Sequence, residues 1–305
     1  MKQGVLKSDL LLLLASLIWG LAFVAQRAGM EYVGPFIFNG IRFAFGAVVL
    51  IPFFSIKSNN RKDHSSKPVI FDKYLLKGGI LAGLVLFVGA SFQQAGLVYT
   101  TAGNAGFITS LYVIFVPVFG LIWKQYPARG TWVGALMAAL GMYLLSVSGG
   151  FTLLFGDLLV LISAFFWAAH VLIIGKLSPG NNPVKLAFVQ FLICSILSLA
   201  AAFIFESNTL TGIYQAAVPI LYGGLLSVGI AYTLQIIAQK KVPPAHAAII
   251  LSLEAVFAAL GGWIILNEVM FFRGLAGCAL MLGGVIVSQF YKPGKGKPSN
   301  KYKFE

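Results

Sequence analysis

Long apolar runs are the feature that most limits how this chain can fold, and the run from Pro244 to Glu268 shows the limit best. Between His246 and Asn267 it holds one charged residue, Glu254. About 20 apolar residues in a row are enough for a helix to cross a bilayer, and a helix satisfies its own backbone hydrogen bonds there. Glu254 then lies near mid-depth, where an ionised carboxylate costs at least about 2.5 kcal/mol. It needs either hydrogen bonds from a neighbouring helix or a cavity in which it binds a substrate or a proton.

Similar runs fill most of the chain. With the segment His246–Ile265 they are Leu10–Ala28, Pro35–Phe54, Leu76–Val98, Asn104–Trp123, Thr131–Ser148, Asp157–Leu177, Val184–Phe205, Ala216–Gln239 and Phe272–Phe290. Only 10% of the residues are charged, whereas a soluble domain has about 25%. The sequence therefore predicts an all-α integral membrane protein with ten transmembrane helices.

The positions of Lys and Arg set the expected orientation. If the N-terminus is cytoplasmic, the cytoplasmic connections and the tail 292–305 carry nearly all of the positive charge, and Arg273 is the exception. Positive charge favours the cytoplasmic side. We therefore expect both termini in the cytoplasm of a multi-pass protein of the plasma membrane, a bacterial inner membrane. The net charge of +13 does not indicate nucleic-acid binding, because no basic face with interleaved aromatic residues occurs on a soluble module.

The two halves of the chain resemble each other. A shift of 148 residues brings Asp9, Trp19, Pro35 and Phe43 onto Asp157, Trp167, Pro183 and Phe191, and a shift of 142 brings Gln93, Ser110 and Gly141 onto Gln235, Ser252 and Gly283. We expect a five-helix repeat in 1–150, a second in 151–291 and a basic tail in 292–305. Because five is odd, the second repeat is inverted in the membrane, which favours a binding site near mid-depth between the repeats.

Several of these residues also match a known family. The Trp19–Gly20 pair, Arg42, the run SLEAVFAALGGWIILNE that ends at Glu268, and the glycines between Gly274 and Gly284 resemble the EamA-type permeases of the drug/metabolite transporter superfamily. The first-half copy of that run lacks the acidic residue that Glu268 supplies. The resemblance covers Leu10–Phe290 and implies a transporter, often an exporter of amino acids or other small metabolites.

Polar side chains inside apolar runs are candidates for a substrate cavity. His170 can bind substrate or relay a proton, or it can be a neutral ring bonded to a neighbouring helix. Arg42 keeps its charge and needs an anion, so it binds a substrate carboxylate or fixes helix packing. Besides Glu254, the further candidates are Trp19, Trp167, Tyr112, Gln94 and Gln190.

Each of these further candidates has a purely structural alternative. The tryptophans can stack on a substrate ring or cation, or pack against lipid and protein. The amides and the phenol can bond neighbouring helices. Tyr112 occupies the repeat position of Glu254, so the pair is expected to face one cavity. Asp9 and Asp157 are expected to cap the starts of their helices.

The sequence favours a secondary transporter that works by alternating access, with proton coupling and facilitated diffusion both open. An intramembrane enzyme and a non-transporting sensor or assembly subunit are the alternatives. No P-loop, HExxH or GxSxG motif occurs, and three histidines without ligand spacing predict no metal site and no cofactor. The aromatic content favours an amphipathic or aromatic small-molecule substrate.

Overall fold

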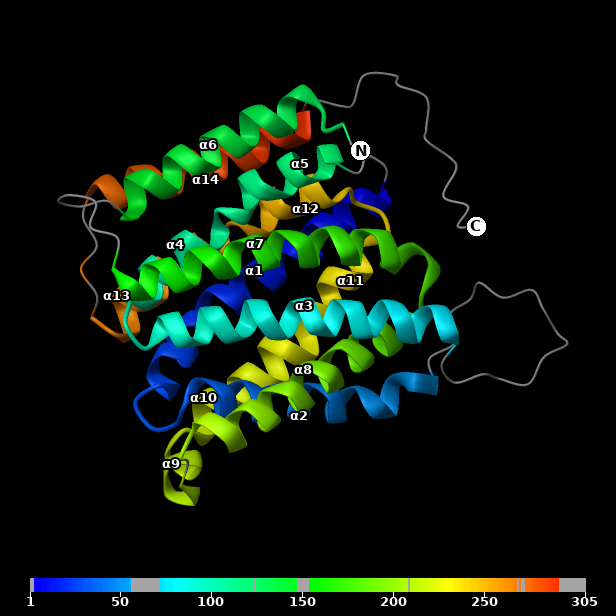
Figure 1. Ribbon diagram of the computed structural model, residues 1–305. Coiled ribbons are helices and arrows are strands. Elements are labelled where there is room, and N and C mark those ends of the chain that lie inside the picture. The colour runs from blue at the N-terminus through cyan, green and yellow to red at the C-terminus, as the bar shows by residue number, and fades with distance from the viewer. Residues whose placement is uncertain are drawn as a thin grey trace, which may run out of the picture.

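The protein is a bundle of helices that lie roughly side by side (Figure 1). The computed structural model describes residues 3–55, 72–122, 124, 126–146, 154–207, 209–267, 269 and 272–290. Their elements are α1 (Gln3–Gly29), α2 (Pro35–Leu50), η1 (Ile51–Ser55), α3 (Lys73–Leu97), α4 (Ala102–Ser110), α5 (Tyr112–Ile122), α6 (Arg129–Ser146), α7 (Phe155–Leu177), η2 (Ser178–Gly180), α8 (Pro183–Phe205), α9 (Leu210–Gln215), α10 (Ala217–Leu221), η3 (Tyr222–Tyr232), α11 (Thr233–Gln239), α12 (Pro244–Leu251), α13 (Glu254–Ile265) and α14 (Phe272–Phe290). The expected tail 292–305 and Glu268 lie outside the described residues.

In the described part of the chain, eight helical segments are long and apolar enough to cross a membrane. They correspond to eight of the ten predicted runs. The other two runs form α6 and α14, which lie against each other at the edge of the bundle (Figure 1). The protein is therefore a multi-pass membrane protein, and the count of ten spanning helices stays a prediction.

Short polar side chains and prolines define several helix starts. Asp72 accepts a hydrogen bond from the backbone N–H of Leu75, and Thr101 accepts one from Asn104. Asp157 accepts one from Leu154, so it does stabilise the start of α7 as expected. The same prediction for Asp9 is wrong. Because α1 begins at Gln3, Asp9 lies inside the helix and its carboxylate contacts another helix instead.

Two of the predicted membrane helices are interrupted. The first divides into α4 and α5 at Leu111, and the second divides into α12 and α13 at Ser252–Leu253. Leu111 and Leu253 are equivalent under the shift of 142 residues. At the second interruption the Ser252 hydroxyl bonds back to the carbonyl of Ile249 at 2.8 Å, a local bond that competes with a regular helix. Each interruption leaves a new helix start in the middle of the bundle, at Tyr112 and at Glu254.

A third irregularity lies in the segment α10–η3–α11. Its middle part, η3, is an 11-residue π-helix, a wide form that is rare and frequently found at functional sites. It packs on α1 and α2. Glycine allows one of the closest approaches around this region: a Cβ on Gly20 of α1 would lie only 2.8 Å from the carbonyl oxygen of Glu254. The small residue therefore lets α1 lie directly against the start of α13.

Candidate functional site

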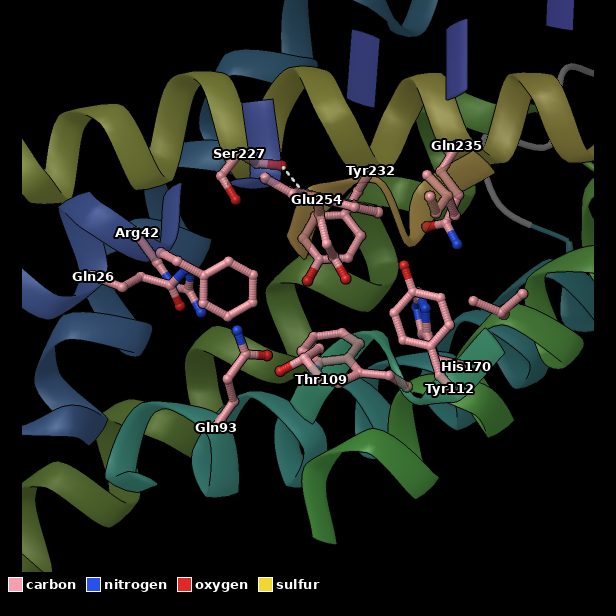
Figure 2. Close-up of a pocket in the computed structure, with 15 residues that line it drawn as sticks. Gln26, Arg42, Gln93, Thr109, Tyr112, His170, Ser227, Tyr232, Gln235 and Glu254 are labelled. Carbon is pink, nitrogen blue, oxygen red and sulfur yellow. Dashed lines mark hydrogen bonds between the residues drawn. The ribbon is translucent and has the colours of Figure 1, made fainter. Parts of the chain in front are cut away.

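A cavity lies inside the bundle where the helix interruptions and the π-helix meet (Figure 2). The cavity and its mouth together have an empty volume of about 480 Å³. The centre of a water molecule can occupy about 40 Å³ of this volume. A water needs about 10–15 Å³ by the second measure, so the closed interior has room for a few waters. The lining residues are Trp19, Phe23, Gln26, Arg42, Gln93, Thr109, Tyr112, Trp167, His170, Val171, Ser227, Tyr232, Gln235, Leu251 and Glu254.

Glu254 lies between the two ends of this cavity. It is the first residue of α13, its side chain is aimed into the space, and the residue keeps 4% of its surface exposed (Figure 2). Its Oε1 accepts a long hydrogen bond of 3.4 Å from the hydroxyl of Ser110, which also bonds the carbonyl of Ser252 at 3.3 Å. The carboxyl is therefore hydrogen-bonded by a residue from α4 and also faces the cavity, and the binding of a substrate or a proton there stays a prediction.

Aromatic rings form one wall of the cavity around Tyr232. The Tyr232 ring lies 4.7 Å from the ring of Trp19 and 6.2 Å from that of Trp167, measured between centroids. The indole N–H of Trp19 donates to the carbonyl of Ser227 in the π-helix at 3.2 Å. The wall is therefore aromatic, with the Trp19 ring tilted by 60° to that of Tyr232, and Trp19 is fixed to the neighbouring helix.

Arg42 provides a fixed positive charge at one end. It is 2% exposed, and its Nε donates to Oδ1 of Asn39 at 2.9 Å, while Asn39 in turn donates to the carbonyl of Ala90. The guanidinium also lies over the ring of Phe43, 5.0 Å from its centroid. Among the described residues no carboxylate lies within 4 Å of it. The local bonds thus hold the side chain in place but do not neutralise its charge.

His170 lies at the opposite end from Arg42 (Figure 2). Its Nε2 forms a 2.9 Å hydrogen bond with Oε1 of Gln190. Gln190 does not itself line the cavity, so its place is behind the histidine ring, which it orients. Gln94 does not line the cavity either; it is buried and donates a hydrogen bond to the carbonyl of Gln26. Its neighbour Gln93 lines the cavity instead.

The structure thus brings six of the eight predicted site residues to the cavity wall: Glu254, His170, Trp19, Trp167, Tyr112 and Arg42. The remaining wall contains Gln93, Gln235 and Tyr232, which stand out as polar groups in apolar runs, and other residues that were not predicted. Phe23 and Gln26 follow Trp19 at helical spacing, so the periodicity of α1 contained the signal for them. Ser227 had none, because its position depends on the π-helix.

Several polar atoms of the wall have no hydrogen-bond partner among the described residues. They are the amide oxygens of Gln26, Gln93 and Gln235, the hydroxyls of Thr109 and Tyr112, and the indole N–H of Trp167. Buried polar groups are almost always hydrogen-bonded, to water or a ligand where the protein offers nothing. The cavity can therefore hydrogen-bond a polar solute at several points while stacking on its apolar part.

A polar cavity surrounded by apolar helices that are long enough to cross a bilayer is the arrangement of a membrane transport protein. Comparison with known families agrees with this class. The model of the EamA-like transporter family matches residues 6–147 and again 154–290. The chain therefore belongs to the EamA-like transporter family, within the drug/metabolite transporter superfamily.

Known proteins with similar sequences are named as transporters, without a substrate. An uncharacterized transporter of Archaeoglobus fulgidus is 35% identical over 93% of this chain and 87% of its own length. The uncharacterized transporter YoaV of Bacillus subtilis is 27% identical, over 90% and 94%. A solved crystal structure has the same fold, with a TM-score of 0.72 at 20% identity over 92% of this chain and 96% of its own. The family and the relatives indicate a transporter rather than an enzyme.

Proposed function

We propose that the protein is a secondary transporter that exports a small metabolite, such as an amino acid, by alternating access. In this proposal two inverted five-helix repeats, 1–150 and 151–291, move against each other around the central cavity. Both termini are cytoplasmic, in a bacterial inner membrane. The substrate binds between Arg42 and His170 and contacts Glu254, which lies between these two ends of the cavity.

Several observations support the two-repeat arrangement. The family model matches the chain twice, once in each half. The helices α1 and α7, which begin the two halves, run in opposite directions (Figure 1). Residues that are equivalent by sequence also meet in the middle: the rings of Phe43 and Phe191 lie 6.1 Å apart, and the hydroxyl of Ser110 bonds the carbonyl of Ser252 at 3.3 Å. Such contacts are expected close to an axis that relates two similar halves.

The observation that carries the proposed function is the position of Glu254. An acidic side chain starts a helix in the middle of a membrane bundle, faces a cavity and has one weak side-chain hydrogen bond among the described residues. Transporters use interrupted helices at mid-depth for substrate and ion sites. A carboxyl in this place can bind a cationic group of the substrate, or exchange a proton during the cycle.

The lining also limits the substrate. Arg42 is the one residue of the lining with a permanent positive charge, and phosphate groups usually need clustered Arg or Lys side chains. The rings of Trp19, Trp167 and Tyr232 provide an aromatic surface instead. These features favour an amphipathic or aromatic solute with a small polar head over a phosphorylated one.

Replacement of Glu254 by glutamine tests the proposal. We expect Glu254→Gln to abolish uptake of labelled amino acids into proteoliposomes, or to remove its dependence on pH. Glu31→Gln, which also removes one carboxylate but from an exposed position, serves as the matched control and should transport normally. Comparison of cell and medium metabolites on overexpression and deletion identifies the solute to use if no amino acid is transported. Normal rates of Glu254→Gln across the whole pH range contradict the proposal.

A further inference from the structure

Asp9 and His246 form a buried ionic contact away from the cavity. Oδ1 of Asp9 in α1 lies 3.1 Å from Nε2 of His246 in the first turn of α12. The side chains keep 7% and 16% of their surfaces exposed, so solvent reaches the histidine. The second carboxylate oxygen of Asp9 is buried and has no partner among the described residues. The contact joins two helices that belong to different halves of the chain.

An equivalent contact exists in the other half of the repeat. Asp157, which matches Asp9 under the shift of 148 residues, accepts a 2.6 Å hydrogen bond from the hydroxyl of Thr100, just before α4. Next to it the backbones of α3 and α7 meet: a Cβ on Gly96 would lie 2.7 Å from the carbonyl oxygen of Gly156. This contact also joins the two halves. Its partner is a hydroxyl, however, where the Asp9 contact has an imidazole.

The two contacts lie beyond opposite ends of the cavity. Asp9 precedes the lining residue Trp19 by ten residues, and Asp157 precedes Trp167 by ten. Ten helical residues span about 15 Å. Because α1 and α7 run in opposite directions, their starts lie at opposite ends of the bundle (Figure 1). One contact therefore lies beyond each end, at a similar distance from the cavity wall.

Several elements pack around His246, and their charged or titratable side chains determine which groups can interact with its imidazole. The elements that pack on α12 are α1, α5, α6, α7 and α14. Their charged or titratable side chains in the described residues are Lys7, Asp9 and Arg27 of α1, Tyr112 of α5, Arg129 and Tyr143 of α6, Asp157, His170 and Lys176 of α7, and Arg273 and Cys278 of α14. Lys240 and Lys241 precede α12. Burial lowers the pKa of Lys240, and the Lys241 ammonium lies against Gly4 of α1. Of all these groups in the described part of the chain, Asp9 is the one that contacts the imidazole.

We propose that Asp9 and His246 form a proton-binding tie that holds one end of the cavity closed, whereas Thr100 and Asp157 hold the other end closed by a bond without a titrating donor. The inference rests on the proposed function, because it needs an alternation between two closed ends. It adds a proton site outside the cavity, separate from Glu254 and His170. The two ends then respond differently to pH although equivalent positions build them.

The direction of the effect follows from the charges. Histidine is the side chain that ordinarily changes charge between about pH 5 and pH 8. A protonated imidazole beside an ionised carboxylate gains Coulomb attraction and a charge-assisted hydrogen bond, and a neutral imidazole keeps only the ordinary bond. A protonated His246 therefore stabilises the closed form of its end more strongly than a neutral His246 does. The Thr100 hydroxyl keeps one protonation state throughout.

Thiol labelling of two buried reporter positions tests the tie without a substrate. Ile250 is buried one turn after His246, and Val160 is buried one turn after Asp157. Each is replaced by cysteine in the full-length protein in lipid nanodiscs, after Cys194 and Cys278 have been replaced by serine. The rate of reaction with N-ethylmaleimide is measured at about pH 8 and about pH 5.5. It is divided by the rate of the same protein in denaturant, which removes the intrinsic effect of pH on the thiol.

We expect the normalised rate at Ile250→Cys to fall roughly three- to tenfold at the lower pH, as for a partly buried ion pair that gains its charge. The rate at Val160→Cys should not change. In the background of His246→Gln, which keeps a neutral hydrogen-bond donor, the rate at Ile250→Cys should be independent of pH. Asp9→Asn should also remove the pH dependence. Size-exclusion chromatography and the melting temperature show whether each variant is folded. We expect His246→Gln to disturb the fold least, because glutamine keeps a hydrogen-bond donor.

Two results overturn the inference. One is a normalised labelling rate at Ile250→Cys that does not change with pH, or that changes by the same factor in the His246→Gln background. The other is an equal response at Val160→Cys, which assigns the effect to a group that both ends share, such as Glu254 or His170. Because the labelling needs no transport, its failure is distinct from a failure of Glu254→Gln to alter uptake.

Discussion

The two ends of the cavity come from equivalent parts of the chain but carry different chemistry. Under the shift of 148 residues Arg42 matches Gln190. At its own end Arg42 is a fixed cation, held by Asn39 and without an acid within 4 Å among the described residues. At the other end Gln190 lies behind the wall and orients His170, a group that can be neutral. The two stretches that the family model matches therefore carry different polar groups at aligned positions, and a solute with a charged head meets two different ends.

The largest effect on uptake is expected when Arg42 is replaced by glutamine, the residue found at the matching position 190. Arg42→Gln removes the fixed cation, and we expect uptake into proteoliposomes to fall by about 10- to 100-fold, the range for loss of a charge-assisted hydrogen bond. Arg42→Lys keeps the charge but not the fork that bonds Asn39, so an intermediate loss is expected. Glu31→Gln again controls for expression and reconstitution. Normal uptake by Arg42→Gln assigns the arginine to helix packing alone.

A smaller effect is expected at the neutral end. Gln190→Leu removes the bond that orients His170, and we expect about a two- to tenfold loss of uptake, the range for one ordinary hydrogen bond. His170→Gln should give a loss of similar size and, with Gln190→Leu added, little more, because both variants remove the same interaction. Rates and the double-mutant cycle are measured in proteoliposomes. Fully additive losses contradict the view that Gln190 acts through the histidine.

The neighbours Gln93 and Gln94 separate binding from packing near the Arg42 end. Gln93 lines the cavity, and its amide oxygen has no partner among the described residues, whereas Gln94 bonds the carbonyl of Gln26 behind the wall. We expect Gln93→Leu to raise the KM for uptake several-fold, and Gln94→Leu to lower thermal stability with little change in KM. Concentration series and melting curves give both values. A change of KM in the second variant alone reverses the two assignments.

The smallest effect concerns the matched tryptophans. Trp19 donates its indole N–H to Ser227, and Trp167 has no such partner in the described part of the chain. Trp19→Phe should cost about 0.6 and at most about 1.7 kcal/mol of stability through that bond, while Trp167→Phe loses no protein hydrogen bond. Unfolding of both variants in mild detergent measures the difference. Equal stability of the two variants shows that the Trp19 bond contributes nothing measurable.

The site was predictable where a polar residue stands out against an apolar run. Glu254, His170 and Arg42 were found because a charged or titratable group inside lipid needs a reason, and all three line the cavity. The sequence could not decide whether Gln93 or Gln94 lines the cavity, since adjacent residues of a helix differ by about 100° in direction and composition does not fix the rotation. The rotation is set by packing against other helices.

The fold was predictable to the level of helical segments. The apolar runs agree with the observed helices because a run of this length has few other stable forms in lipid. The interruptions at Leu111 and at Ser252–Leu253 and the π-helix Tyr222–Tyr232 were not predicted. The two interruptions meet across the bundle through the bond between Ser110 and Ser252, a contact between distant segments that the sequence does not reveal. Asp9 was placed wrongly because α1 begins at Gln3, several residues before the apolar run.

The sequence by itself determined that this chain is a helical membrane protein with polar groups inside its apolar runs, because hydrophobic length and the cost of a charge in lipid are local properties of the chain. Its motifs added the resemblance to the EamA-type permeases. Only the tertiary structure decided which of those groups share a cavity, which ones orient them from behind, and where helices break. Those features depend on how helices rotate and approach one another, and that is set by packing between residues far apart in the chain.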